Sequence, residues 1–331
     1  MDGGNRYRRS NLTHCLAQTS RVFPEADHVV SVQGDTSWVS TVVPGESLLV
    51  PPGIPDGVFR KSALLNAAVR ARPGYDGYVM VDADVYLSRP IVDYVIAHVP
   101  GPVLCYPFGD VMYLHGPDTR NLVAGLPLLP GTKNHGNNIE RQTGLCMGFT
   151  REQFDAVNGF DEAFTGWGAE DDAFMFKLRR LYGRADRNPD VSARIYHMFH
   201  PAVGTEEYKK SDPVYMRNRV YCACVRRMSD ADFAEYVAGR VDLDSLVEKY
   251  RAMGRLQVAL QWQCTPSTYL DVDTTIYDIP RDGRMTFGKV LDAIMVEDGQ
   301  VGVDEFSDEV LRKIPDLTDE MKADIDARAS K

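Results

Sequence analysis

Long apolar runs are missing from this sequence of 331 residues. A helix that spans a bilayer needs about 20 mostly apolar residues, and no such stretch occurs, so we expect no membrane span. The opening residues, MDGGNRYRRSNL, also lack the apolar segment of a secretory signal peptide. These two absences lead us to expect a cytoplasmic protein.

The sequence also lacks an excess of positive charge and a cysteine spacing suited to zinc. Lys and Arg number 37 against 47 Asp and Glu, which gives a formal net charge of −10. A broad nucleic-acid-binding surface is usually basic, so this balance disfavours one. Short basic runs at 6–9, 179–180 and 226–227 leave a local basic edge open, although solvated surface is the plainer interpretation. The six cysteines are expected to be reduced thiols.

Predicted strands and helices alternate over the first ~200 residues, which is typical of an α/β fold with a mostly parallel sheet. Strands are expected at 28–35, 77–87, 102–108 and 193–199, and helices at 59–71, 91–99, 151–164 and 168–183. Residues 109–140 have the composition of a loop. Further helices are expected at 228–253, 285–296, 307–314 and the C-terminal end. We therefore expect a first domain at 1–205 and a mainly helical extension at 206–331, which either holds an acceptor or mediates a homodimer.

Two aspartates follow the apolar run YVMV, in the stretch Asp82-Ala83-Asp84. Such a pair is a weak signal alone, and Asp271-Val272-Asp273 repeats the spacing elsewhere. The first copy differs because it ends a predicted buried strand, where carboxylates can hold Mg²⁺ or Mn²⁺ together with substrate phosphates. An ordinary strand end followed by a polar turn is the alternative.

Three adjacent acids, Glu170, Asp171 and Asp172, open a predicted helix directly after GWGA. Acidic residues at a helix N-terminus are favoured by the helix dipole, so capping is the alternative reading. Successive side chains point about 100° apart, however, so one of the three can face a substrate as a general base. Two glycines flank Trp167, which displays a large ring on a loop.

His197 and His200 lie three residues apart in the stretch IYHMFHP. A single histidine on a strand is usually structural. Two at this spacing, in a chain with a candidate carboxylate site, favour a metal site, and imidazole combined with carboxylate suits Mn²⁺ better than a set of oxygen ligands alone.

Together, DAD after a strand, GFDEAFTGWGAEDD and HMFH resemble the GT-A-fold nucleotide-sugar glycosyltransferases. The likeness is greatest to β-1,4-galactosyltransferases and to the C-terminal motif of polypeptide N-acetylgalactosaminyltransferases, and chondroitin-polymerase-type domains are similar. It covers roughly residues 5–203, and GWGAEDD is its most specific part.

The resemblance implies an enzyme that uses Mn²⁺ (or Mg²⁺) and moves a sugar from a UDP-sugar to an acceptor hydroxyl, with inversion. It implies Asp84, His197 and His200 as metal ligands, Asp171 as the base, and Glu170 as a contact to a sugar. It further implies donor contacts by Arg6, Asp35, Arg60, Asn66, Asp82 and Asp84, and sugar or acceptor contacts by Trp167, Gly168 and Asp172.

Two positions depart from the family pattern. Family members begin with a strand before the position of Asn5-Arg6, whereas only MDGG precedes it here. Galactosyltransferases carry a fourth acid where this chain has Ala173, which weakens any transfer of their substrate choice.

Two other classes compete with the transferase hypothesis. A nucleotidyltransferase would show a Gly-rich basic loop after the first strand, and none is seen. A non-catalytic sugar-binding module is the other, and it would be marked by loss of Asp84 or Asp171. The acceptor stays open between a glycan, a protein side chain and a modified base in DNA, and the sequence does not name the sugar.

Overall fold

The structure, a computed structural model, describes residues 6–34, 37–55, 57–129, 143–200 and 212–253. The chain divides into two compact units, 1–203 with 221–246, and 204–220 with 247–331. The first unit carries the strands and all the site residues discussed below. In the second, the described residues belong mainly to parts of the helices α8 and α10. Within the described ranges, no helix is both long and apolar enough to cross a membrane.

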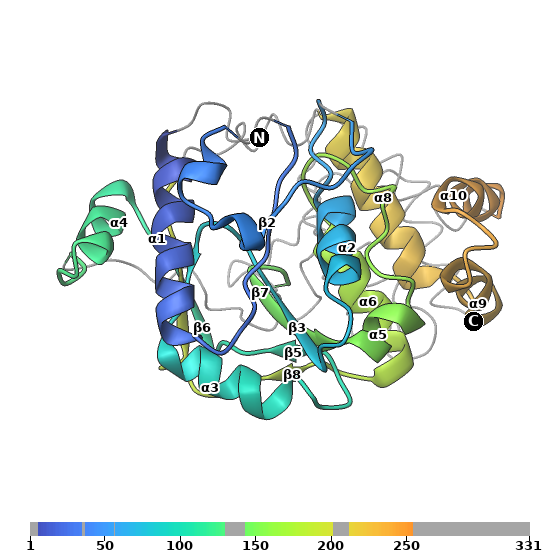
Figure 1. Cartoon of the computed structure of the whole chain (residues 1–331). Helices are drawn as coiled ribbons and strands as arrows, with labels where there is room; N and C mark the ends of the chain where they lie inside the picture. The colour runs from blue at the N-terminus through green and yellow to red at the C-terminus, as the bar shows by residue number, and fades with distance from the viewer. Residues whose placement is uncertain (1–5, 35–36, 56, 130–142, 201–211, 254–331) are drawn as a thin grey trace, which may run out of the picture. The chain divides into compact units, whose positions relative to one another are not determined.

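A four-stranded sheet forms the centre of the first unit (Figure 1). Its order is β3 (Gly77–Val81), β7 (Cys146–Thr150), β5 (Cys105–Tyr106) and β8 (Asp186–Arg187). Strand β7 runs antiparallel to both β3 and β5, and β8 runs parallel to β5.

A second, three-stranded sheet has the order β4 (Val85–Tyr86), β9 (Arg194–His197) and β6 (Asp110–Tyr113). Strand β9 pairs antiparallel with β4 and parallel with β6. The residues between β3 and β4 are Asp82, Ala83 and Asp84, so this acidic stretch connects the two sheets. A separate parallel pair joins β1 (Val30–Ser31) to β2 (Leu48–Leu49).

The α/β class predicted from the sequence is confirmed, but the strand pairing is mixed where a mostly parallel arrangement was expected. Parallel and antiparallel pairs occur side by side in both larger sheets. The central strand β7 accounts for much of the difference. An antiparallel strand does not need the crossover helix that joins parallel neighbours, so the alternation of elements along the chain did not reveal it.

Helices flank the strands, with α1 and α2 on opposite sides and α5 and α6 on the same side as α2 (Figure 1). Helix α2 is rich in Ala and Leu and ends before Pro73-Gly74. The helices are α1 (Arg6–Val22), α2 (Lys61–Ala71), α3 (Arg89–His98), α4 (Gly116–Val123), α5 (Arg151–Ala156), α6 (Glu170–Tyr182), α8 (Pro213–Arg227), α9 (Asp230–Val237) and α10 (Leu243–Ala252).

Several predicted boundaries need correction. The strand expected at 28–35 is reduced to the two residues of β1. Residues 109–140 were expected to be a loop, yet they contain β6 and α4. Helix α4 begins with Gly116-Pro117, and proline in a first turn is compatible with a helix because its missing N–H has no helical partner there. The helices expected at 285–296, 307–314 and the C-terminal end, and the second Asp-X-Asp stretch, lie outside the described residues.

Aromatic rings, packed face to face and edge to face, form the part of the core that supports helix α6. The ring centroids of Phe160 and Phe174 lie 3.9 Å apart, and those of Phe149 and Phe174 lie 5.1 Å apart. All three rings are fully buried or nearly so. Truncation of such a ring to alanine typically costs about 3–5 kcal/mol. This packing fixes the beginning of α6, where the three adjacent acids lie.

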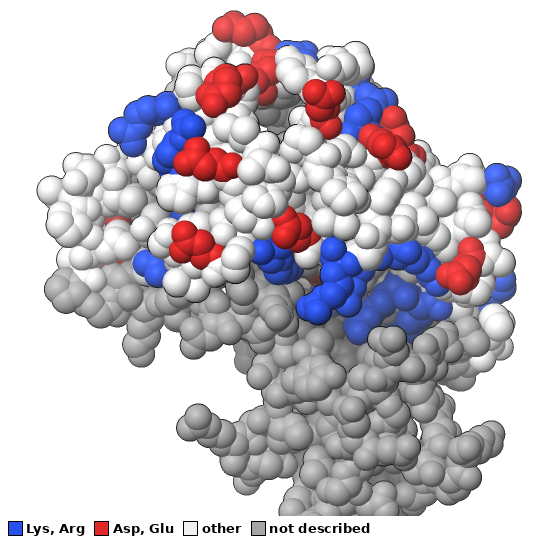
Figure 2. Space-filling model, turned by 90° about the horizontal axis from the view of Figure 1, so that it is seen from below, with Lys and Arg blue, Asp and Glu red and all other residues white. Residues whose placement is uncertain are grey.

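Basic side chains gather at the lower centre of the face shown in Figure 2, while elsewhere on that face basic and acidic side chains are interspersed. Two arginines from the basic pairs in the sequence are engaged within the fold. Arg180 donates a hydrogen bond to the carbonyl of Met228 and pairs with Asp230. The guanidinium of Arg226 lies 5.4 Å from the ring centre of Phe176. These contacts give both arginines a structural role.

Candidate active site

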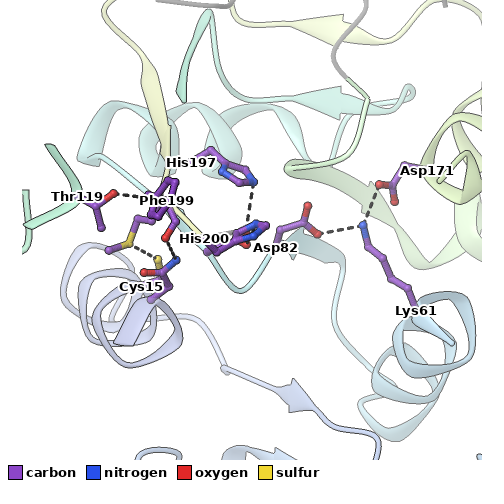
Figure 3. A network of polar contacts seen from close by, with 11 residues as sticks. Cys15, Lys61, Asp82, Thr119, Asp171, His197, Phe199 and His200 are labelled. Carbon is purple, nitrogen blue, oxygen red and sulfur yellow. Dashed lines mark hydrogen bonds and ion pairs between the residues drawn. The ribbon is translucent and has the colours of Figure 1, made fainter. Parts of the chain in front are cut away.

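Asp84, His197 and His200 come together where the DAD stretch meets the end of β9. Figure 3 shows the two histidines side by side. The Nε2 atom of His200 lies 3.0 Å from Oδ2 of Asp84, and Nε2 of His197 lies 3.8 Å from Oδ1. One ligand atom from each residue can be chosen so that all lie within 4.8 Å of one another. These three residues are the predicted metal ligands, and the fold brings all of them to one place.

Backbone hydrogen bonds hold the two histidines in register with the DAD stretch. The N–H of Met198 donates to the carbonyl of Asp84 over 2.8 Å, and Val85 is the register partner of His197. The N–H of Leu114 donates to the carbonyl of His197 over 2.9 Å. The triad therefore depends on the pairing of β9 with both of its neighbours.

The two residues between the histidines anchor this segment to helices α1 and α4. Met198 is fully buried, with its sulfur 3.2 Å from the thiol of Cys15. The N–H of Phe199 donates to Oγ1 of Thr119, and its carbonyl accepts from Nδ2 of Asn11 (Figure 3). Both imidazoles lie on the side of Asp84.

The environment of Asp84 favours its ionised form. Burial acts to raise the pKa of Asp84, but the hydrogen bond from His200 and the charges of His197, His200 and Arg8 outweigh it and lower that pKa below the ordinary value. A carboxylate must be ionised to bind a metal ion. One ionised carboxylate with two imidazoles is a donor set that fits Mn²⁺, whereas Mg²⁺ prefers oxygen ligands alone.

A single ammonium group, that of Lys61, joins three carboxylates beside this triad. Its Nζ lies 2.8 Å from Oδ2 of Asp171, 3.0 Å from Oδ1 of Asp82 and 3.2 Å from Oε1 of Glu170. Figure 3 shows Lys61 reaching from helix α2 between Asp82 and Asp171. If all three acids are ionised, the cluster carries two more negative than positive charges, which favours the approach of a divalent cation.

Burial and crowding perturb the protonation of this cluster. Burial raises the pKa of Asp171 to about 8, with Glu170 and Asp82 adding to the rise and Lys61 opposing it. Burial alone would lower the pKa of Lys61, yet Asp171, Asp82 and Glu170 hold it well above its ordinary value. Lys61 therefore stays charged, while Asp171 exchanges its proton near neutral pH. That is the behaviour required of a general base.

The segment 143–145 lies against both acidic motifs. The hydroxyl of Thr143 donates a hydrogen bond to Asp172, and the carbonyl of Leu145 accepts the N–H of Asp82. Gly144 has a φ of +75°, and a Cβ atom added there would lie 2.4 Å from Oδ2 of Asp171. Both the backbone conformation and the close approach require glycine at this position.

Backbone conformation also displays Trp167 and orients the start of α6. Gly166, Gly168 and Ala169 all have positive φ angles, and the N–H of Gly166 donates to the carbonyl of Phe59. The side chain of Trp167 is 56% exposed. The stretch thus presents an indole ring next to the acids, as the glycines on both sides of it predict.

Asn66 has a different role from the predicted donor contact. Its Nδ2 donates to the carbonyl of Phe160 and to Oε1 of Glu162, and its Oδ1 accepts the N–H of Phe160. Both amide protons are therefore used inside the fold. The prediction missed this because the spacing along α2 does not show which side chains face the loop after α5.

The predicted donor-binding roles of Arg60, Arg6 and Asp35 stay predictions. The N–H of Arg60 donates to Oε1 of Gln33 at the start of α2. Arg6 begins helix α1, and its side chain lies outside the described residues. Asp35 also lies outside them.

Sequence reasoning missed Lys61, Gly144 and Thr143. Lys61 opens the helix before the DAD strand, where a lysine is ordinary in sequence, so nothing in the pattern marked it. Thr143 and Gly144 follow a stretch of loop-like composition, so nothing in their spacing marked them.

Comparison with known proteins confirms the resemblance for the segment that carries two of the three motifs. Residues 133–201 match the model of a family described as the N-terminal domain of galactosyltransferase. GWGAEDD and HMFH both lie in this segment, and the match supports the prediction that the chain is a glycosyltransferase.

The crystal structure of the catalytic domain of Drosophila β1,4-galactosyltransferase 7, in complex with xylobiose, is similar at 19% identity and a TM-score of 0.36. The alignment covers 59% of this chain and 68% of that one. No curated protein matches the chain.

Proposed function

We propose that this chain transfers a sugar from a UDP-sugar to an acceptor hydroxyl, with inversion and with Mn²⁺ bound at Asp84, His197 and His200. The observation that carries the proposal is the chain connection Asp82-Ala83-Asp84. Asp84 belongs to the candidate metal triad and Asp82 to the cluster around Lys61, so one short turn joins a metal site to a candidate base.

The metal triad would act on the leaving group. A divalent ion stabilises the negative charge that develops on a departing diphosphate. Asp84, His197 and His200 would hold that ion, and Asp82 would contact the donor beside it. Lys61 is a second cation close to Asp82.

Asp171 would act on the acceptor. A hydroxyl group needs a base as it attacks C1 of the sugar, and a base whose pKa lies near the working pH is the most effective. The raised pKa of Asp171 meets that requirement. Glu170 would bind a sugar hydroxyl, and the exposed ring of Trp167 would stack on a sugar. A glycan end or a protein side chain suits the acidic net charge better than a modified base in DNA.

Thermal stability in the presence of nucleotides tests this proposal. UDP, GDP and ADP are compared with and without Mn²⁺, on the wild type and on Asp84→Asn. A ligand at 100 times its Kd adds about 2.7 kcal/mol to the free energy of unfolding, so binding is readily detected. We expect a stabilisation by UDP that requires Mn²⁺ and is lost in Asp84→Asn.

Asp155→Asn is the matched control, because Asp155 is an exposed acid paired with Arg151. It should respond to UDP and Mn²⁺ as the wild type does. If no nucleotide stabilises the wild type, or if Asp84→Asn keeps the full response, the proposal is wrong.

A further inference from the structure

The two carboxylate oxygens of Asp171 have different surroundings. Oδ2 accepts a hydrogen bond from Nζ of Lys61 over 2.8 Å. Oδ1 is buried and has no hydrogen-bond partner among the described residues. A buried carboxylate oxygen without a partner is costly, so such an atom in a native structure calls for an explanation. A hydroxyl group supplied by a ligand would satisfy it.

On the other side of the carboxylate, Oδ2 is already engaged by two close neighbours. Gly144 approaches so closely that even a Cβ atom there would lie 2.4 Å from Oδ2. Lys61 also contacts Oδ2 and is held in turn by Asp82 and Glu170. Because the ammonium group has three protons, it can donate to all three acids at once. Oδ2 is therefore held in place, and Oδ1 is the oxygen that has no partner among the described residues.

We infer that Lys61 is a positioning residue, which holds Oδ2 of Asp171 so that Oδ1 receives the proton of the acceptor hydroxyl. The inference rests on the function proposed above and goes beyond it by assigning a role to Lys61. In the step, the acceptor oxygen forms a bond to C1 of the sugar while its proton passes to Oδ1. The bond from C1 to the phosphate oxygen breaks, and its electron pair leaves with the nucleoside diphosphate.

The charged and titratable groups around Asp171 come from three other parts of the fold and from its own helix. Lys61 lies on α2, Asp82 follows β3, Tyr106 lies on β5, and Glu170 precedes Asp171 on α6. Lys61 supplies the positive charge among these groups. Its loss would make the carboxylate harder to ionise, in addition to freeing it to rotate.

A double-mutant cycle separates this role from direct binding of the donor. The variants are Lys61→Met, Asp171→Asn and the double variant. The probes are UDP-galactose and UDP-N-acetylgalactosamine with Mn²⁺, with water as the acceptor and released UDP as the readout. The Kd of UDP with Mn²⁺ is measured in parallel by calorimetry.

Lys61→Met should lower kcat at least about 30-fold, while the Kd of UDP changes less than about threefold. In the Asp171→Asn background, the same substitution should change kcat less than about threefold, because Lys61 acts through Asp171. Lys61→Arg should restore part of kcat. The inference would be overturned if Lys61→Met lowered kcat by the same factor in the wild type and in Asp171→Asn. It would also be overturned if Lys61→Met weakened UDP binding as much as it lowered kcat.

A measurement that needs no turnover is the pKa of the Asp171 carboxyl by ¹³C NMR, which should rise by at least about one unit in Lys61→Met. An unchanged value would also overturn the inference.

If Lys61→Met does not fold, Lys61→Gln serves in its place. Arg89→Met, which removes an exposed partner of Asp93, is the control and should match the wild type. A wild type that does not bind UDP with Mn²⁺ defeats the proposed function itself, whereas an active wild type with a normal Lys61→Met defeats this inference alone.

Discussion

The Nε2 atom of His200 lies 3.0 Å from Oδ2 of Asp84, although the two residues are far apart in the sequence. The short ladder between β4 and β9, in which Val85 faces His197, produces this contact. Side chains on a strand alternate between faces, so a shift of one residue would turn His197 away from Asp84. The candidate metal site is therefore a consequence of strand register.

Replacement of Asp171 by asparagine should abolish turnover while stabilising the fold at alkaline pH. Loss of a general base typically lowers the rate about 10²–10⁴-fold. The folded pKa of Asp171, about 8, exceeds its unfolded value, so its contribution to stability is complete at acid pH and is lost as the pH rises through about 8. Thermal unfolding is measured between pH 5 and pH 8 (roughly the interval between the two pKa values). As the pH rises, the Tm of Asp171→Asn should increase relative to the Tm of the wild type. A constant difference would show that Asp171 titrates normally.

Activity of the wild type should rise with pH and level off above about 8. The ionised carboxylate is the active form, and burial shifts its pKa upward. Below the pKa, kcat for release of UDP from a UDP-sugar should fall about tenfold per pH unit. The profile is measured at saturating donor and Mn²⁺. A rate that is flat from pH 5.5 to pH 8 (roughly the range over which the ionised fraction of a group of pKa about 8 rises to one half) would argue against Asp171 as the base.

Gly144→Ala should lower kcat more than its effect on stability explains. The new Cβ would displace the Asp171 carboxylate, and a non-glycine residue at positive φ costs about 1–2 kcal/mol. Gly53→Ala is the matched control, since Gly53 has a φ of +77° with open space around the added atom. Both variants should lose similar stability in urea unfolding, and only Gly144→Ala should lose activity. Equal activities would mean that the close approach is unimportant.

Asn66→Ala should destabilise the fold without weakening donor binding. The substitution removes three hydrogen bonds and leaves the backbone groups of Phe160 without their partner, at a cost of about 2–4 kcal/mol. Urea unfolding measures that cost, and calorimetry with UDP and Mn²⁺ measures binding. A Kd that rises about tenfold would restore Asn66 as a donor contact.

The local pattern of the sequence was enough to predict most of the helices and the strand before Asp82. Helix α2 is rich in Ala and Leu, which favour a helix without help from distant residues, and proline and glycine mark its end. The antiparallel pairing of β7 was not predictable in this way, because it depends on contacts between distant segments. Strand β6 was missed since its four residues gain their structure from β9.

The candidate site likewise contains residues that the sequence marks and residues whose role only the fold reveals. Asp84 could be singled out because its stretch ends a predicted buried strand, and His197 and His200 because they lie three residues apart in one motif. Lys61 could not, because a lysine at the start of a helix is ordinary until the fold places three carboxylates around it. The role of Asn66 likewise depends on where the loop at 160–162 lies.

Binding of Mn²⁺ is the measurement that tests the central claim most directly. Free Mn²⁺ is titrated by electron paramagnetic resonance in the presence of UDP, for the wild type, Asp84→Asn, His197→Ala and His200→Ala. His98→Ala is the control, because the His98 ring stacks on Tyr94 on helix α3. We expect each triad variant to weaken Mn²⁺ binding at least about tenfold, which is about 1.4 kcal/mol, and the control to match the wild type. Triad variants that bind Mn²⁺ as tightly as the wild type would contradict the account.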